Sequence, residues 1–261
     1  MRLSIELVPR TRADFAHQLA AVAPHAADLV MHGFDTINVP SAPRYGLDAV
    51  SACSAAHARG WYGIPHLRSM DIRADEVDLL IEHLREARVR EVLIVAGDPP
   101  ARGAPRAPDM SPDRLLAALA GGAPEITRYA CFDPNHAPDA CALTRIEEKL
   151  AAGASGLFAQ PSFTAASIEH WQGALASRLS ARQIWWGASP VLGARSLSWW
   201  QRVNRVVFPD DFTPTLDDWN RRLPLLHRAA RGAEGNLYVM PIKAPIDATL
   251  APLLPAAALR A

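Results

Sequence analysis

The sequence predicts an α/β fold, a single (β/α)8 barrel that spans residues 1–261. Short apolar runs rich in β-branched residues alternate with longer Ala-, Leu- and Arg-rich segments of helical period, which is typical of strand–helix units with parallel strands. About eight such units can be counted, and a chain of this length commonly forms one barrel. An open, doubly wound sheet is the competing architecture, but no G-x-G-x-x-G motif follows the first predicted strand.

Each predicted strand is a short apolar run bounded by polar, glycine or proline residues. In chain order these strands are Leu3–Val8, Thr36–Val39, Gly63–His66, Glu91–Val95, Glu125–Cys131, Gly156–Ala159, Gln183–Gly187 and Asn236–Pro241. Three helix starts pair a capping side chain with an apolar face: Thr11, Ser111 and Thr164.

Two segments read as loops because they are rich in proline or lack a helical or strand period. They are residues 99–108, after the fourth strand, and residues 208–214, before the last helices. The Ala-rich segment from Ala244 onward predicts a closing helix. Loops that follow strands are where a barrel places its active site.

Composition excludes several functions. Lys plus Arg and Asp plus Glu number 27 each, so the chain has no overall positive charge to attract nucleic acid or an anionic membrane. The three cysteines lack C-x-x-C spacing, and the histidines lack metal-ligand spacing. No apolar run reaches the length of a membrane span, and the first residues lack a signal-peptide core. We therefore expect a cytoplasmic protein without metal, nucleic-acid or membrane partners.

Polar residues at the C-terminal ends of the predicted strands are the candidate site, because such barrels place their active sites there. Glu6 lies in an otherwise apolar strand, where an inward-pointing carboxylate without a partner costs free energy. It could face solvent or pair with Arg10 or Arg44, or it could act with a second carboxylate as an acid/base pair. The full set is Glu6, Asn38, His66, Asp98, Asp133–His136, Gln160 and Lys243.

The most distinctive short motif is Gly97-Asp98-Pro99-Pro100, which follows the apolar run Val92–Val95. It places a carboxylate on a tight, proline-stiffened turn directly after a buried strand. Turn chemistry alone would also justify an aspartate at this point.

Four segments together resemble the methylenetetrahydrofolate reductase family, in its short, single-domain bacterial type. The order and spacing of the four agree with the family over nearly the whole chain. They are Ser4–Pro9, Pro65–Leu67, Leu93–Pro100 and Ala151–Gln160.

The resemblance implies an oxidoreductase of one-carbon metabolism and methionine biosynthesis that reduces 5,10-methylenetetrahydrofolate to 5-methyltetrahydrofolate. NADH or NADPH would be the co-substrate, with hydride passing through FAD. As catalytic residues, Glu6 would protonate the folate nitrogen and Asp98 would hydrogen-bond the pterin. Gln160 would supply an amide donor and acceptor to the pterin edge, and Phe163 would stack on an aromatic part of the ligand.

The flavin side departs from the family pattern. Residues 38–41 read Asn-Val-Pro-Ser where the family has a Thr-Tyr-Gly-like segment, and Ala96 stands in place of Arg. Glu147 and Glu148 would repel a diphosphate held by the neighbouring basic residues. His66 and His136 could bind the cofactor, or they could be ordinary polar side chains that are hydrogen-bonded within the protein. The cofactor-binding candidates are Asn38, His66, Gly97, Asp98, His136, Arg145 and Lys149.

Two alternatives stay open beside the flavin-dependent reductase. A flavin-free, folate-binding or methyl-transfer partner protein would explain the altered flavin contacts, whereas the presence of Glu6 favours an enzyme. A reductase that passes hydride directly from nicotinamide to folate is the other. Analogy with related barrels adds the expectation of a homo-oligomer. One member of the pair Trp185-Trp186 should face the barrel interior, near where a ring of the ligand would stack.

Overall fold

The computed structural model describes residues 1–41, 48–97 and 110–255 and forms a closed barrel of parallel strands in the order β1 to β8. All eight predicted strands overlap an observed one, so the (β/α)8 fold is confirmed. The first strand ends at Glu6, earlier than expected, and the N–H of Leu7 makes one more hydrogen bond, to the carbonyl of Asn38. The strands are β1 Leu3–Glu6, β2 Phe34–Pro40, β3 Tyr62–Arg68, β4 Glu91–Val95, β5 Thr127–Phe132, β6 Gly156–Pro161, β7 Ile184–Ala188 and β8 Asn236–Val239.

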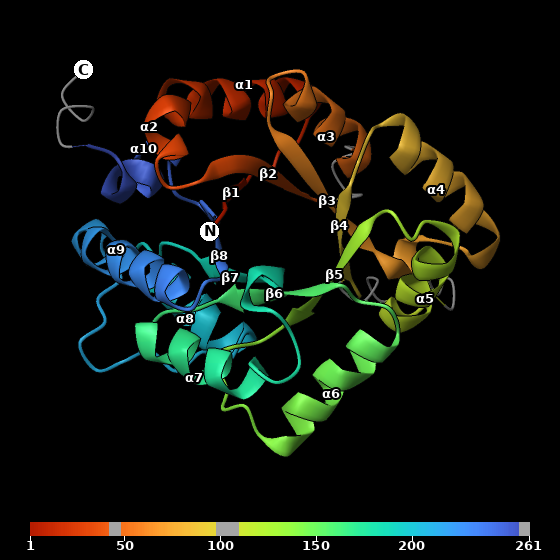
Figure 1. Cartoon of the computed structure of the whole chain (residues 1–261). Coiled ribbons are helices and arrows are strands. Elements are labelled where there is room, and N and C mark those ends of the chain that lie inside the picture. The colour runs from red at the N-terminus through yellow and green to blue at the C-terminus, as the bar shows by residue number, and fades with distance from the viewer. Residues whose placement is uncertain (42–47, 98–109, 256–261) are drawn as a thin grey trace.

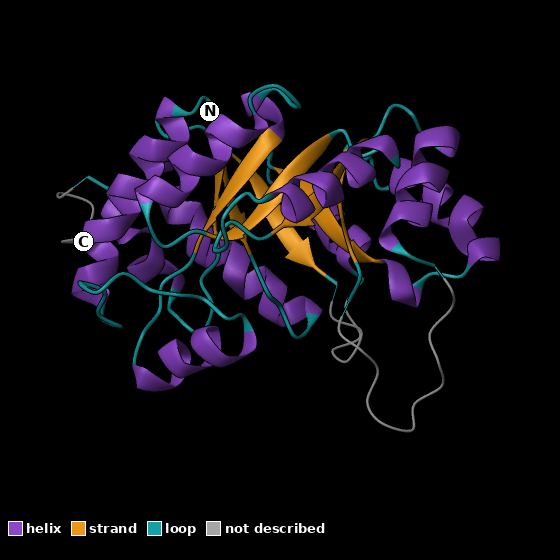
Figure 2. Ribbon diagram, turned by 90° about the horizontal axis from the view of Figure 1, so that it is seen from below, coloured by secondary structure: helices purple, strands orange, loops and turns teal. Residues whose placement is uncertain are grey.

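Helices surround the barrel on its outside (Figure 1). Viewed from the side, they flank the strands in the centre of the molecule (Figure 2). None of the helices in the described part of the chain has the length and apolar character needed to cross a bilayer. They are α1 Arg12–Val22, α2 Ala26–Val30, α3 Ala49–His57, α4 Val77–Glu86, α5 Pro112–Gly122, α6 Ala140–Ala151, α7 Ala165–Leu175, α8 Ala194–Val203, α9 Leu216–Gly232 and α10 Ile246–Leu250.

The predicted helix caps are confirmed. Thr11, Ser111 and Thr164 each accept a hydrogen bond from a backbone N–H in the first turn of α1, α5 and α7. The predicted loop 208–214 lies between α8 and α9, and the predicted closing helix begins with α10. The other predicted loop, residues 99–108, lies outside the described residues.

Alternation along each strand divides the apolar residues into two sets. In β1, Leu3 and Ile5 join the layer between strands and helices, whereas Ser4 and Glu6 point into the barrel. Trp185 packs inside the barrel and Trp186 outside it, as the sequence predicts. Both indoles are fully buried, so they are core residues and leave no ring face free for a ligand. The barrel interior contains Ile64, Leu93, Tyr129, Phe158, Trp185, Tyr238 and Met240.

The end of the barrel at the N-termini of the strands is closed by a charged network around Arg2. The guanidinium donates to Asp35 and to Glu91, at 3.0 Å and 2.8 Å, and also to Thr36. Tyr129 adds a hydrogen bond to Glu91. We call this set the barrel floor. The opposite end, at the C-termini of the strands, is the mouth.

Candidate functional site

Three predicted site residues come together at the mouth on neighbouring strands β1, β2 and β3. Glu6 and Asn38 are register partners on β1 and β2, and His66 pairs with Pro40 of β2. The Oε2 atom of Glu6 lies 3.9 Å from Nε2 of His66. Glu6 is 8% exposed, His66 7%, and Asn38 fully buried. The sheet register therefore gathers side chains that lie far apart in the sequence.

Burial sets the charge of the Glu6–His66 pair. It raises the pKa of Glu6 to about 8, because a carboxylate loses its hydration inside the barrel. It lowers the pKa of His66 to about 3 for the corresponding reason. Although the two side chains lie within ion-pair distance, both are neutral at neutral pH. Glu6 thus keeps a proton under conditions where an exposed glutamate has lost it, which is the state that a general acid requires.

Two further titratable groups face Glu6, and the candidates drawn from the sequence do not include them. Burial raises the pKa of Cys131, on β5, to about 11, while the Lys149 charge lowers it and the Glu6 charge raises it. Burial likewise raises the pKa of Tyr238, on β8, whose hydroxyl donates to the carbonyl of Ala159. Cys131 ends a predicted strand, so the rule that selected the other candidates could have found it. Tyr238 could have been found too, because side chains alternate along a strand and every second one on β8 points into the barrel.

A second group of predicted residues lines an open pocket beside the mouth, between β5, β6 and α6. We call it the rim pocket. It contains about 1050 Å³ of empty space, including open solvent. The Lys149 Nζ atom donates to the carbonyl of Cys131 at 2.6 Å. The structure thus brings together four of the sequence-predicted residues: His136, Arg145, Lys149 and Gln160.

The acidic residues that the sequence places beside these basic groups do not line the rim pocket. Glu147 binds Arg178 at 2.7 Å, and neither Glu147 nor Glu148 lines the pocket. Glu147 and Glu148 therefore do not face the space that the basic residues line. Asp133 and Asp139 do line the pocket, and Asp133 lies 3.6 Å from Nε2 of His136.

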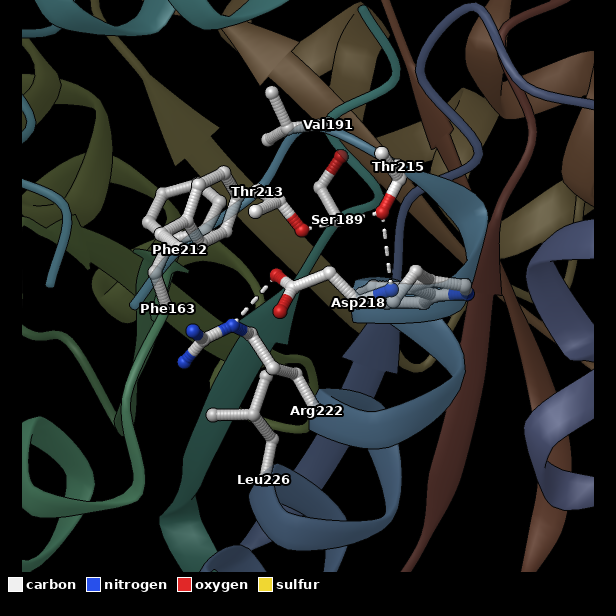
Figure 3. Close-up of a pocket in the computed structure, with 10 residues that line it drawn as sticks. Phe163, Ser189, Val191, Phe212, Thr213, Thr215, Asp218, Arg222 and Leu226 are labelled. Carbon is white, nitrogen blue, oxygen red and sulfur yellow. Dashed lines mark hydrogen bonds and ion pairs between the residues drawn. The ribbon is translucent and has the colours of Figure 1, made fainter. Parts of the chain in front are cut away.

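Phe163 lies apart from both groups. Its side chain is 5% exposed and packs against Phe208, with ring centroids 4.7 Å apart, and against Trp200. Figure 3 shows Phe163 beside Phe212 in a small cavity, where Asp218 faces Arg222. The cavity has room for about one water molecule. The structure therefore places Phe163 in an aromatic cluster and does not bring it to Glu6 or the rim pocket.

The backbone directly after β4 explains why position 97 is a glycine. Gly97 has a φ of +94°, and a Cβ atom there would lie within 3.0 Å of the side chains of Arg68 and Met70. Only glycine fits this turn without strain. Asp98, predicted as a catalytic and binding residue, lies outside the described residues. Within the described ranges, no three His, Cys, Asp or Glu side chains gather in a way that could hold a metal ion.

Comparison with one solved structure supports the fold. The chain is similar to an uncharacterized protein from Clostridium thermocellum that binds two copies of 5-methyl-5,6,7,8-tetrahydrofolic acid. The TM-score is 0.67 at 9% identity, over 97% of this chain and 93% of that chain. Phosphoenolpyruvate phosphomutase from Streptomyces platensis subsp. rosaceus matches at a TM-score of 0.49 and 14% identity, over 92% of this chain and 76% of that one.

The sequence matches no family model and no curated protein. The similarity to the Clostridium protein lies in the fold, because so low an identity carries no residue roles. The chain is a (β/α)8 barrel, and its structural neighbours include a barrel that binds folate.

Proposed function

We propose that the chain binds a reduced folate at the barrel mouth and reduces 5,10-methylenetetrahydrofolate to 5-methyltetrahydrofolate with a reduced nicotinamide. The observation that carries the proposal is Glu6, a buried acid that holds its proton at neutral pH at the end of the barrel where such folds do their chemistry. Binding of 5-methyltetrahydrofolate by the Clostridium barrel supports the ligand class.

The role of Glu6 is proton transfer. Its O–H bond breaks as the folate nitrogen takes the proton, and the imidazolidine ring opens to an iminium ion. Hydride from NADH or NADPH then adds to the methylene carbon and gives the methyl group. The reaction consumes one proton and one hydride. In the dry interior, proton donation by a neutral acid avoids a permanent buried charge before the reaction begins.

The rim pocket is the proposed site for FAD: Arg145 and Lys149 would hold the diphosphate, and Asp133 and Asp139, which line the same pocket, would have to lie away from it. Phosphate oxygens need charge-assisted donors, which Arg145 and Lys149 can supply, and the ring N–H of His136 would be a further donor. Lys149 uses one N–H for the carbonyl of Cys131 and has two more to offer. FAD would supply a carrier for the hydride. Gln160, exposed on the same rim, is the proposed amide partner of the pterin edge.

The proposal is tested by following oxidation of NADH and NADPH with 5,10-methylenetetrahydrofolate as the acceptor, before and after adding FAD. We expect folate-dependent oxidation by the wild type. Glu6→Gln should reduce turnover by about 10²-fold or more, with folate affinity nearly unchanged, because proton transfer is lost while the side-chain shape is kept. Equal turnover by the two proteins would remove Glu6 from the mechanism.

A second function, a folate-binding or methyl-transfer partner protein, is favoured by Ala96. This residue is exposed after β4 and offers no charge to a cofactor. Calorimetric titration with 5-methyltetrahydrofolate separates the two functions. Binding of the folate without any nicotinamide oxidation, with or without FAD, would select the partner protein over the reductase.

A further inference from the structure

At the mouth, buried polar atoms face the barrel interior with no hydrogen-bond partner among the described residues. Among the residues that the structure describes, neither amide atom of Asn38 has a hydrogen-bond partner, and the same is true of Nε2 of His66. Both side chains are more than nine-tenths buried. Buried polar groups in folded proteins are almost always hydrogen-bonded, and ordered water satisfies those that no protein atom reaches.

The geometry around these atoms suits one bridging molecule. Glu6 and Asn38 are register partners on parallel strands, so their side chains point to the same side of the sheet. The 3.9 Å between Oε2 of Glu6 and Nε2 of His66 is too long for a direct hydrogen bond. A polar pair at such a separation is commonly joined by water. A water between the three side chains would have about three partners, the usual number for a buried water.

The surroundings of Glu6 explain why such a molecule matters. Among the residues that the structure describes, titratable groups that face Glu6 are His66 of β3, Cys131 of β5 and Tyr238 of β8. Burial lowers the pKa of His66 to about 3 and raises the pKa of Cys131 to about 11 and that of Tyr238 as well. None of the three is charged at neutral pH. Lys149 brings a cation close to Cys131 through its hydrogen bond to the carbonyl of that residue, and hydrogen bonds are a second means of stabilising the Glu6 carboxylate once the proton is gone.

We propose that one internal water molecule binds between Glu6, Asn38 and His66 and donates a hydrogen bond to the Glu6 carboxylate after proton transfer. Asn38 and His66 are then positioning residues for the acid. Asn38 holds the water through its amide, and His66 accepts from it or donates to it through Nε2. The existence of the water site does not depend on the proposed function. Its role does, since folate reduction is what removes the proton from Glu6.

The test is an infrared pH titration of the full-length protein, in which the carboxylic-acid band of Glu6 is identified by its loss in Glu6→Gln. In the wild type the band should disappear with a midpoint below the value of about 8 that burial alone gives Glu6, because the water stabilises the carboxylate. Asn38→Leu, of nearly the same shape, should raise the midpoint by about one pH unit, because the carboxylate loses its water. Asn38→Ser keeps a polar group and should restore the wild-type midpoint.

Ser4→Ala is the matched control. Its hydroxyl is also buried and without a partner among the described residues, but it lies one inward position earlier on β1. The midpoint of Glu6 should not change in this variant. An unchanged midpoint in a folded Asn38→Leu protein would overturn the proposal. So would a shift of the same size in Ser4→Ala.

A high-resolution crystal structure of the wild type gives a test that requires no variant. We expect one water within hydrogen-bond distance of Glu6, Asn38 and His66, and a site without ordered water would overturn the proposal. Neither measurement uses folate or a nicotinamide. A shifted midpoint together with no reductase activity would thus support the water site and contradict the proposed function. Reductase activity together with an unshifted midpoint would support the proposed function and contradict the water site.

Discussion

At the scale of single residues, Glu6 and His66 link the chemistry of the mouth to the stability of the fold. Burial favours the protonated form of Glu6 and the neutral form of His66 in the folded protein. The Glu6 contribution to stability is present in full below the ordinary carboxyl pKa of 4.5 and is lost as pH rises to about 8. The His66 contribution is present above the ordinary imidazole pKa of 6.5 and is lost as pH falls toward 3.

These two contributions predict how stability depends on pH. Between pH 4.5 and 6.5 they change in opposite directions and offset each other, whereas from 6.5 to about 8 only Glu6 acts and stability should fall. Urea unfolding at a series of pH values checks this, with Glu6→Gln as the comparison. The decline above 6.5 should be smaller in the variant. An identical decline in both proteins would show that Glu6 is not the group responsible.

The same residue predicts the pH dependence of turnover. If Glu6 is the proton donor, kcat/KM for the folate should be constant below pH about 8 and should fall about tenfold for each further pH unit. The measurement is folate-dependent nicotinamide oxidation over this range. A profile that shows no fall above 8 would contradict the role of Glu6 as the acid.

At the scale of secondary-structure elements, the N-terminus of α9 is held by an ion-pair cluster. The Asp218 side chain is 2% exposed and binds Arg222 at 2.7 Å and Arg221 at 2.5 Å. Thr215 caps the helix and accepts from the backbone N–H of Asp218. Asp218 and Arg222 line the same small cavity as Phe163 and Phe212, so these ion pairs hold the start of α9 beside the aromatic cluster.

Asp218→Ala should therefore lower the free energy of unfolding by about 2 kcal/mol, because the largely buried Arg222 side chain loses a partner that no solvent replaces fully. Thermal or urea unfolding measures the change. Arg73→Ala is the control, since Arg73 and its partner Asp75 are exposed and exposed pairs contribute little. Equal effects of the two substitutions would mean that burial of the α9 pair adds nothing.

At the scale of the whole molecule, the barrel separates stability from chemistry along its axis. The floor joins strands β1, β2, β4 and β5 through Arg2, and the guanidinium also lies 5.1 Å from the ring centroid of Trp185. The mouth holds Glu6, His66 and the rim pocket. In barrels of this kind the floor serves stability and the mouth carries the active site.

Arg2→Met should thus destabilise the protein by about 3 kcal/mol, because it leaves the largely buried Glu91 side chain without its cation. Folate affinity of the folded variant should stay within about twofold of the wild type, because the substitution lies at the opposite end of the barrel. Unfolding curves and calorimetric titration measure the two quantities on the same samples. A large loss of affinity in a folded variant would show that floor and mouth are coupled.

Much of the fold was predictable from the sequence because its determinants are local. The alternation of apolar runs and helical periods marks the strand–helix units, and Thr11, Ser111 and Thr164 mark helix starts through contacts three residues away. Strand ends also located Glu6 and His66, since parallel strands in a barrel present their C-terminal residues on one face.

The sequence by itself therefore determined the fold class, the positions of the strands and the placing of Glu6, Asn38 and His66 on three neighbouring strands. Only the tertiary structure decided how Glu6 is charged, that Cys131 and Tyr238 face it, that Phe163 packs in an aromatic cluster, and that Glu147 turns to Arg178. The physical reason is that burial, pairing and pKa depend on neighbours contributed by distant parts of the chain, whereas periodicity and capping depend on residues within a few positions.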